Sequence, residues 1–335
     1  MKEKSPFFSI IMPVYNMGGF LSKSIGSLLS QSFKDWELVA VDDGSVDETP
    51  IILDNYAKFD TRIKVIHQKN SGCAGAARNT ALKYISGQYM QMLDADDYFS
   101  PDLLETLKKR IDETNADIIV PIAKSVDDKN NILYEWLPPN SDYKQIITGS
   151  EAFELSLDWS IHGWMCVYVP LLKKIGYESK LMNGDEFTTR KLFHNAKTVA
   201  FAKGIYFYFN NLNSTTKRVE PRLQLYQPLN TTYNIYLYAL SNADLKDSIN
   251  ILANSFLTSL ISFEIKYFKE LKELKKLNRN VEVNNFLRDM YSKKNKEMLK
   301  SLTILKHRII YSISFNSFLL FKFYCCVYAT ICSKR

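Results

Sequence analysis

The sequence lacks the glycine-rich motifs with which many α/β proteins bind nucleotides. Only 12 glycines occur among its 335 residues. No G-x-G-x-x-G follows the first predicted strand, which excludes the usual dinucleotide-binding site. No G-x-x-x-x-G-K-[ST] follows it either, which excludes a phosphate-binding loop of the NTPase type. Prolines are also few, at 10, so the chain is neither collagen-like nor of low complexity.

The sequence is also poor in cysteine and histidine. Its five cysteines include no C-x-x-C pair, and its four histidines show no metal-binding spacing. An odd number of irregularly spaced cysteines is not a disulfide framework, and it favours a reducing compartment. A zinc site of His and Cys is excluded on the same grounds. The N-terminal residues turn polar after Met12, so they do not predict a signal peptide.

Apolar and aromatic residues, by contrast, are plentiful. Hydrophobic residues make up 46% of the chain, and Phe and Tyr number 20 each. This is enough for a sizeable core, so a disordered chain is excluded, and the length indicates about two domains.

Strand and helix signals alternate through the first 120 residues. Short apolar runs predict strands, and between them apolar residues recur at helical spacing. These repeated units predict an α/β, Rossmann-like fold, with a mostly parallel sheet and helices on both faces. The predicted strands are Phe7–Met12, Glu37–Val41, Ile63–Ile66, Gln88–Leu93 and Asp117–Ile122.

The pattern is less regular after this region and becomes helical near the C-terminus. Residues 127–143 are predicted to be a loop, and residues 221–300 to be long helices. We therefore predict a catalytic domain at 1–216 and a helical C-terminal region at 217–335. Between them we expect helices at Ser150–Leu157 and Glu186–His194, and short strands at Thr198–Phe201 and Ile205–Phe209.

Positive charge is concentrated in the C-terminal tail. Residues 264–335 hold 16 Lys and Arg against 6 Asp and Glu, whereas the rest of the chain holds 27 against 30. The tail also contains the uncharged run Ile309–Phe321, then Lys322, then the apolar run Phe323–Ile331. A spanning helix needs ~20 uninterrupted apolar residues, so this pattern favours a helix lying on a membrane surface. A helix packed on its own domain, a membrane-spanning helix and a solvated helical face are the alternatives. Charges set beside apolar runs argue against a nucleic-acid partner.

Polar residues follow the first two predicted strands, where ligands bind in sheets of this kind. Pro13, Tyr15 and Asn16 come after the first strand, and the ring of Tyr15 could stack on a base. Asp42 and Asp43 come after the second, where a carboxylate can accept a hydrogen bond from a ring N–H or a ribose hydroxyl. A packed Tyr and a helix-capping turn are the alternatives.

The next two strand ends suggest an anion site and a cation site. Small residues in the segment Asn70–Asn79 lead into a helix start, where backbone N–H groups and Arg78 could hold a phosphate. A close contact between helix and sheet is the alternative there. The fourth strand is followed by Asp94-Ala95-Asp96-Asp97. Carboxylates without His or Cys favour Mg²⁺ or Mn²⁺, and an acidic capping turn is the alternative.

In their order and approximate spacing, these four segments resemble the family 2 glycosyltransferases, which are nucleotide-sugar-dependent enzymes with the GT-A fold. The resemblance covers residues 7–115 closely and 116–216 loosely. It implies that Asp96 binds Mn²⁺ or Mg²⁺ on the diphosphate and that Tyr15 and Asp43 hold the uracil of a UDP-sugar. The residues it assigns to nucleotide-sugar binding are Pro13, Tyr15, Asn16, Asp43, Arg78 and Asp94.

The family also has an acidic catalytic motif, usually Glu-Asp, at a helix start about ninety residues later. The matching stretch here is Asn183–Phe187, in which Gly184 replaces the Glu. The resemblance places the catalytic base at Asp185, with Glu186 as the alternative. A carboxylate suits this role, because transfer to an alcohol needs a group that takes its proton as the new bond forms.

Trp164, with His162 before it, is a candidate acceptor contact, because a sugar ring can pack on an aromatic ring. A buried core Trp is the alternative. Processive synthases of the family resemble one another in a Gln-x-x-Arg-Trp motif, which this sequence lacks, so transfer of a single sugar is expected.

The sequence thus predicts an inverting glycosyltransferase that moves one sugar from a nucleotide sugar, expected to be UDP-linked, to a hydroxyl. The expected acceptor is lipid-linked or a surface glycan, as in capsule, O-antigen or exopolysaccharide assembly. The expected location is cytoplasmic, peripheral on the inner face of the cell membrane. A non-catalytic glycan-binding or scaffold protein, and a sugar-1-phosphate nucleotidyltransferase, are the alternative functions.

Overall fold

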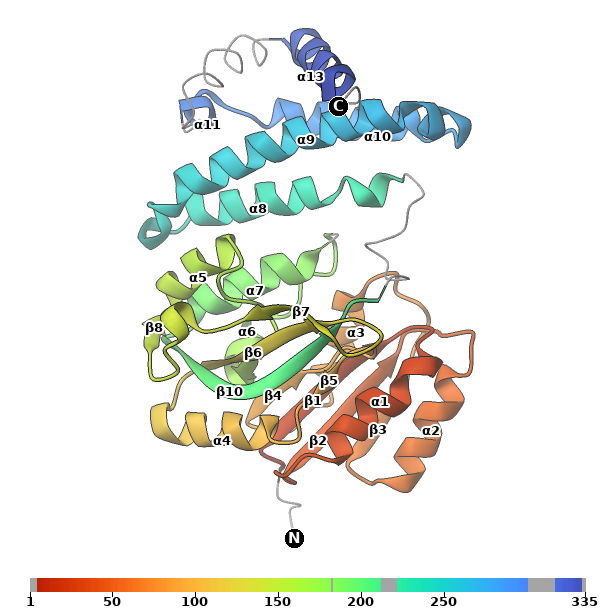
Figure 1. Ribbon diagram of the computed structural model, residues 1–335, viewed down its shortest axis with the longest axis vertical. Helices are drawn as coiled ribbons and strands as arrows, with labels where there is room; N and C mark the ends of the chain where they lie inside the picture. The colour runs from red at the N-terminus through yellow and green to blue at the C-terminus, as the bar shows by residue number, and fades with distance from the viewer. Residues whose placement is uncertain (1–4, 182, 212–221, 301–316, 333–335) are drawn as a thin grey trace. The chain divides into compact units, whose positions relative to one another are not determined.

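The computed structural model describes residues 5–181, 183–211, 222–300 and 317–332 (Figure 1). The chain divides into two compact units, Met1–Lys180 with Gly184–Leu212, and Leu181–Asn183 with Asn213–Arg335. The boundary predicted near residue 216 lies outside the described residues.

The first unit contains both strands and helices. In chain order they are β1 (Phe8–Val14), α1 (Gly18–Leu29), β2 (Trp36–Asp42), α2 (Thr49–Phe59), β3 (Ile63–His67), α3 (Ala74–Ala81), β4 (Tyr89–Met92), β5 (Tyr98–Phe99), α4 (Leu103–Thr114), β6 (Ile118–Val126), β7 (Ile132–Trp136), β8 (Ile146–Thr148), α5 (Gly149–Leu157), β9 (Cys166–Tyr168), α6 (Val169–Ile175), α7 (Gly184–Asn195) and β10 (Thr198–Phe209).

All strands of the first unit belong to one sheet, in the order β3-β2-β1-β4-β9-β6-β10-β5. Strands β1 to β4 pair parallel to one another, and β6 pairs parallel to β10. Strand β9 pairs antiparallel with β4 and β6, and β5, β7 and β8 are antiparallel to their partners. The predicted α/β fold is confirmed, but the sheet is mixed rather than mostly parallel. The four antiparallel strands are short, and the sequence pattern did not predict them.

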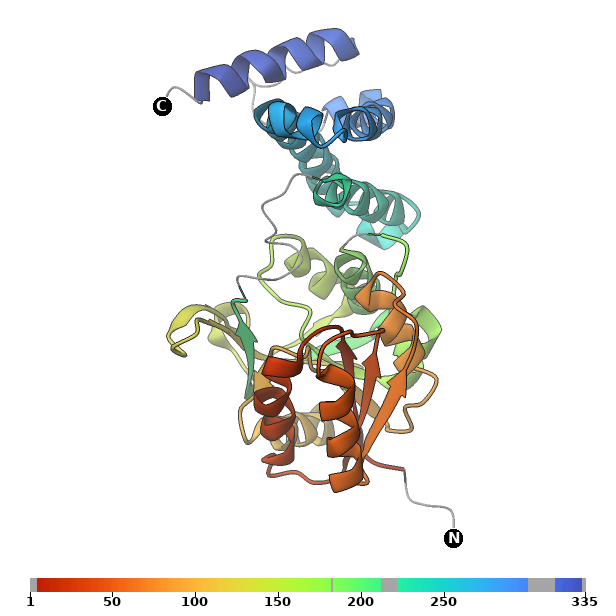
Figure 2. The same cartoon turned by 90° about the vertical axis from the view of Figure 1, so that its right-hand side faces the viewer.

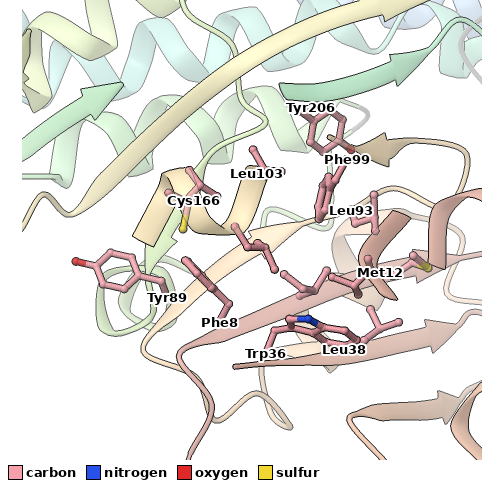
Figure 3. Packing of buried hydrophobic residues seen from close by; sticks show 14 of the residues in the cluster. Phe8, Met12, Trp36, Leu38, Tyr89, Leu93, Phe99, Leu103, Cys166 and Tyr206 are labelled. Carbon is pink, nitrogen blue, oxygen red and sulfur yellow. The ribbon is translucent and has the colours of Figure 1, made fainter. Parts of the chain in front are cut away.

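Helices cover both faces of this sheet, as predicted (Figures 1 and 2). Successive residues of a strand point to opposite faces, so each strand contributes to two cores. In β1, Ile10 and Met12 join the core under α1, α2 and α4, while Ile11 joins the core under α3, α5, α6 and α7. Figure 3 shows the first of these cores, where the rings of Tyr206 and Phe99 lie 5.6 Å apart between centroids.

Strand β10 corrects one prediction, because Thr198–Phe209 is a single strand rather than two. Its pairing with β6 shifts register between Phe201 and Ile205. Gly204 lies in this irregularity, where an added Cβ would come within 2.3 Å of Oγ1 of Thr106. The polar Lys203-Gly204 step reads as a break in the sequence, but here it forms a bulge against α4.

The second unit is helical in its described residues, as predicted. It contains α8 (Pro228–Leu240), α9 (Ser248–Lys276), α10 (Asn280–Ser292), α11 (Lys296–Lys300) and α13 (Phe318–Cys332). Within the described ranges, α9 is the one helix whose length and apolar composition would allow it to cross a membrane, and 44% of its most apolar window is buried. Its side chains pack against α8, α10 and α13, so α9 is the central helix of this unit.

Helix α13 contains the end of the predicted tail. Phe321 and Cys325 are fully buried, and Nζ of Lys322 lies 3.4 Å from Oε1 of the buried Glu264 on α9. This side of α13 is therefore packed on its own unit, which was an alternative prediction for the tail. Residues 301–316, with most of the run Ile309–Phe321, lie outside the described residues.

Candidate active site

The loops after β1 and β2 meet at one edge of the sheet, because parallel strands bring their carboxyl ends together. Asn16 joins the two loops, since its backbone N–H donates to Oγ of Ser45 at 2.9 Å and its Oδ1 accepts from the N–H of Val46 at 2.8 Å. Its φ of 53° is left-handed, a conformation that Asn tolerates better than most residues. Beside it, the Tyr15 ring is 45% exposed and open to a ligand.

Pro13 lies inside β1 rather than after it, which corrects the predicted strand end. Strand β4 pairs only with Phe8–Ile11 of β1. Beyond Ile11 this side of β1 needs no N–H donor, so a proline fits there.

Asp43 is buried and organises the loop after β3. Its carboxylate accepts hydrogen bonds from Nε2 of Gln68 at 2.6 Å, and from the N–H and hydroxyl of Ser71 at 3.0 and 2.8 Å. It is 5% exposed. The structure thus uses Asp43 to join the ends of β2 and β3, beside the exposed Tyr15.

Arg78 and Asp94 come together from α3 and the end of β4. Nη2 of Arg78 donates to Oδ1 of Asp94 at 3.1 Å, and Arg78 is 6% exposed. Burial alone would lower the pKa of Arg78, but the charges of Asp94 and Asp185 outweigh it and raise that pKa above its usual value. The arginine therefore stays charged next to two predicted site residues.

The acidic turn after β4 is fixed by hydrogen bonds to Tyr206 of β10. The Tyr206 hydroxyl donates to Oδ2 of Asp97 at 2.7 Å and accepts from the N–H of Asp94 at 3.2 Å. The N–H of Phe209 donates to the other Asp97 oxygen at 2.8 Å. Burial raises the pKa of Asp97 well above its usual range, and the carboxylates of Asp94 and Asp96 raise it further. Asp97 is thus a buried supporting residue.

Asp94 and Asp96 remain half-buried at this turn, and Nδ2 of Asn211 donates to Oδ2 of Asp96 at 3.0 Å. Within the ranges that the structure describes, no group of three or more His, Cys, Asp or Glu side chains is arranged to hold a metal. Two carboxylates suit an ion such as Mg²⁺, which usually takes its other oxygens from phosphates and water. The donor set therefore fits a divalent ion shared with a diphosphate.

The two candidate base residues lie in the first turn of α7. Asp185 is exposed, and its Oδ1 accepts from the N–H of Glu186 at 3.1 Å. Oε2 of Glu186 lies 3.5 Å from Nη1 of Arg190, one turn further along the same helix. Of the two carboxylates, it is Asp185 that lines the same small cavity as Arg78. This cavity has a volume of about 20 Å³.

The packing of the loop before α7 leaves no room for a side chain at position 184. This accounts for Gly184 at a position where the resembled family usually has an acidic residue. A Cβ at position 184 would lie 2.6 Å from the carbonyl oxygen of Glu178, and one at Gly75 would lie 2.3 Å from the same oxygen. Glu178 is held there because its N–H donates to Oγ1 of Thr188 at 2.8 Å. The carbonyl of Glu178 therefore lies between α3 and α7, and a side chain at 184 has no room.

Asn79 fixes the same loop from the side of α3. Its Nδ2 donates to the Tyr177 carbonyl and its Oδ1 accepts from the Tyr177 N–H, both at 2.8 Å. Asn79, Asp97 and Tyr206 are supporting residues that the sequence pattern did not assign. Asn79 and Asp97 belong to the small-residue and acidic segments, which was the signal for them, whereas nothing in the sequence set Tyr206 apart from the other rings of its strand.

Trp164 is partly buried in a cluster of rings. Its centroid lies 5.6 Å from that of Tyr206 and 5.0 Å from that of Tyr208. His162 is 1% exposed, its Nε2 lies 2.8 Å from the Pro121 carbonyl oxygen, and its Nδ1 accepts from the Trp164 N–H at 3.1 Å. Burial lowers the pKa of His162 to about 4, so the ring is neutral. Contrary to the expectation from the sequence, His162 positions Trp164 rather than facing an acceptor.

Known proteins resemble this chain in sequence and in fold. Residues 9–159 match the sequence model of glycosyl transferase family 2. Glycosyltransferase GlyA of Streptococcus pneumoniae is 31% identical over 209 residues, which cover 60% of this chain and 30% of GlyA. The teichuronic acid biosynthesis glycosyltransferase TuaG of Bacillus subtilis, a putative assignment, is 40% identical over 105 residues, which cover 31% of this chain and 42% of TuaG.

The crystal structure of S. aureus TarS 1-349 in complex with UDP-GlcNAc has the same fold. It superposes with a TM-score of 0.69 at 23% identity, over 96% of this chain and 89% of TarS 1-349. The fold and the sequence similarity together indicate a glycosyltransferase with the GT-A fold. More narrowly, over residues 9–159 the chain is similar to glycosyltransferase family 2.

Proposed function

We propose that this protein is an inverting glycosyltransferase that moves a single sugar from a UDP-sugar to a hydroxyl of a cell-envelope glycan or lipid-linked acceptor. The observation that carries the proposal is the position of Arg78, bonded to Asp94 on one side and within charge range of Asp185 on the other. This position supports a donor site next to a carboxylate that could act as a base.

In the proposed reaction Asp185 accepts the proton of the acceptor hydroxyl while the oxygen attacks the anomeric carbon. The exposed carboxylate of Asp185 is accessible to such a hydroxyl, and Glu186 is held toward Arg190. The bond from the sugar to the diphosphate breaks as the new bond forms, and in-line attack inverts the anomeric centre. Arg78 and the N-terminus of α3 add positive charge near the departing diphosphate.

We propose that the donor nucleotide is UDP and that donor binding uses Mn²⁺ or Mg²⁺. The TarS complex with UDP-GlcNAc supports the choice of UDP. Asp94 and Asp96 would hold the ion against the diphosphate, and Tyr15 and Asp43 would contact the uracil ring. When bound, a divalent ion neutralises charge that develops on the leaving diphosphate.

The acceptor class is proposed from the relatives and from the C-terminal helix. A similarity to TuaG, named for teichuronic acid biosynthesis, supports polysaccharide assembly. On α13, Leu319 and Phe323 are 79% and 70% exposed and lie one turn apart, so they form an apolar face. Such a face beside a basic segment suits binding to an anionic membrane surface on the cytoplasmic side.

The function is tested by incubating the purified chain with UDP-GlcNAc and UDP-glucose, with and without Mn²⁺, and with membranes as the acceptor source. We expect release of UDP and a labelled membrane product whose new linkage has the inverted anomeric configuration by NMR. A chain that binds UDP but transfers no sugar would support the scaffold alternative. Formation of a UDP-sugar from UTP and a sugar-1-phosphate would support the nucleotidyltransferase alternative.

The membrane proposal is tested separately by flotation with vesicles that contain anionic lipid. Glu substitutions at Leu319 and Phe323 should prevent flotation without lowering the melting temperature. Phe59→Glu changes an equally exposed ring on α2 and serves as the control. Deletion of α13 is a poorer test, because it would uncover the side chains that Phe321 and Cys325 bury.

A further inference from the structure

Trp159 is an exposed aromatic residue in a strained turn that the proposed reaction does not yet use. It lies after α5, its side chain is 42% exposed, and its φ is 64°. Left-handed backbone is uncommon for any residue but glycine and is an outlier for a bulky one, with a cost on the order of 1–3 kcal/mol. Such strain persists where the rest of the structure over-determines it, and it concentrates at functional sites.

The turn itself does not need a tryptophan. The N–H of Ser160 donates to Oδ1 of Asp158 at 2.9 Å, and the N–H of Ile161 donates to the Leu155 carbonyl at 3.2 Å. These bonds use the backbone or the Asp158 carboxylate, so they would form with any residue at position 159. Asn or Gly would fit a φ of 64° with less strain.

Arg190 contacts both the Trp159 ring and the helix turn that carries the proposed base. The guanidinium carbon of Arg190 lies 5.3 Å from the ring centroid, which is cation–π range. Arg190 is 4% exposed, and it donates to the carbonyls of Glu186 and Ser156, both at 3.0 Å. One buried arginine thus connects the turn that carries Trp159 to the first turn of α7.

Asp185 is close enough to two arginines for its charge to act on both. Its charge acts on Arg78, which binds Asp94, and also on Arg190, which contacts Trp159. A hydroxyl that Asp185 deprotonates belongs to the acceptor, and Trp159 is an exposed ring that Arg190 connects to the helix turn of Asp185.

We propose that Trp159 is the platform on which a pyranose ring of the acceptor stacks, so that it determines acceptor affinity. This inference rests on the proposed function. The apolar C–H face of a sugar packs on an indole ring, and the guanidinium against Trp159 restricts the ring's movement. The class of ligand is a hexopyranoside with an apolar face, supplied as the terminal sugar of a glycan or glycolipid.

The test compares Trp159→Asn and Trp159→Phe with the wild type in transfer from UDP-GlcNAc to a panel of methyl glycosides and short oligosaccharides. Trp159→Asn should raise the acceptor KM about tenfold, with a smaller effect on kcat, and Trp159→Phe should restore most of the affinity. Because Asn suits the left-handed turn, the melting temperature should stay equal or rise. Phe59→Ala removes another exposed ring, far along the chain on α2, and is the matched control.

An unchanged acceptor KM, a lower melting temperature, or an equal rise in donor KM would overturn the inference. A donor-free readout separates its failure from that of the proposed function. The same glycans should change the tryptophan fluorescence of the wild type, and Trp159→Phe should lose that change. If the wild type transfers no sugar, the proposed function fails while this titration still decides on Trp159. If transfer occurs but neither readout depends on Trp159, the platform alone is refuted.

Discussion

The two sides of the candidate site differ in how firmly their residues are held. On the side proposed for the donor, Asp43 and Asp97 are buried, and each accepts hydrogen bonds at both carboxylate oxygens. On the side proposed for the acceptor, Asp185 and Trp159 are exposed, and Arg190 is the buried group that connects their segments.

This difference fits two different tasks. A nucleotide diphosphate is the same ligand in every cycle, so a rigid, prearranged site binds it with little cost of ordering. An acceptor at the end of a growing glycan is larger and more variable, which suits an open surface with an aromatic platform. Substitutions on the two sides should therefore affect different kinetic parameters.

The largest expected effect is at the proposed base. Asp185→Asn keeps the shape of the side chain and removes its basicity, so turnover should fall by roughly 10²–10⁴. The affinity for UDP, measured by calorimetry, should persist, because the donor side is built from other residues. Glu186→Gln is the matched control, with a smaller loss expected since that carboxylate faces Arg190.

Two other outcomes would change this assignment. If Glu186→Gln abolishes turnover and Asp185→Asn is mild, the base is the neighbouring residue. If both variants are mild, transfer does not use either carboxylate.

The second effect is at the proposed metal site. Asp96→Ala should weaken UDP binding about 10–100-fold in Mn²⁺, because half of the protein's carboxylate donor set is lost. In EDTA the variant and the wild type should bind UDP alike. Wild-type UDP affinity that is the same in Mn²⁺ and in EDTA would contradict the proposal and leave Asp96 a purely structural partner of Asn211.

The residues of the proposed donor side were largely predictable from the sequence, whereas on the proposed acceptor side Asp185 was predicted and Trp159 was not. Asp43, Arg78 and Asp94 follow strands or begin helices, so periodicity alone brings them to one edge of the sheet. The family and the α/β fold were predicted on these segments and are confirmed. Their roles as donor ligands stay predictions.

What the sequence could not give depends on contacts between distant segments. Tyr206 reads as one ring in an aromatic strand, and only its hydrogen bonds to Asp97 and Asp94 reveal its supporting role. Strand β7 reads as part of a polar loop, because its pairing with β6 comes from register and not from local pattern. The strain at Trp159 comes from its backbone φ, which the residue pattern does not predict.

A third test asks how far the packing of the loop before α7 fixes the base. Gly184→Ala places a Cβ 2.6 Å from the Glu178 carbonyl, which is backbone and cannot move cheaply. We expect a loss of stability of about 1–3 kcal/mol, measured by chemical denaturation, and a fall in turnover as α7 shifts. Gly19→Ala is the control, because nothing lies within 4 Å of the added Cβ and Ala favours the helix. Equal stability for the two variants would show that the loop adapts to a side chain at position 184.

The smallest expected effect concerns the charge of His67 and its contribution to stability. His67 on β3 contacts two carboxylates, with Nδ1 2.8 Å from Oδ2 of Asp42 and Nε2 3.1 Å from Oδ1 of Asp54. The hydrogen bonds to Asp42 and Asp54 raise the pKa of His67 above its usual 6.5. The protonated ring can donate to both carboxylates, whereas the neutral ring donates to one.

A raised folded-state pKa means that this stabilisation is present below pH 6.5 and is lost as the pH rises through the folded value. The melting temperature of the wild type should therefore exceed that of His67→Gln at pH 5.5, and the gap should narrow by pH 9. The ring is 43% exposed, so solvent keeps the gap small. A gap that widens with pH would show that the neutral ring is the stabilising form and that the donor side does not depend on this charge.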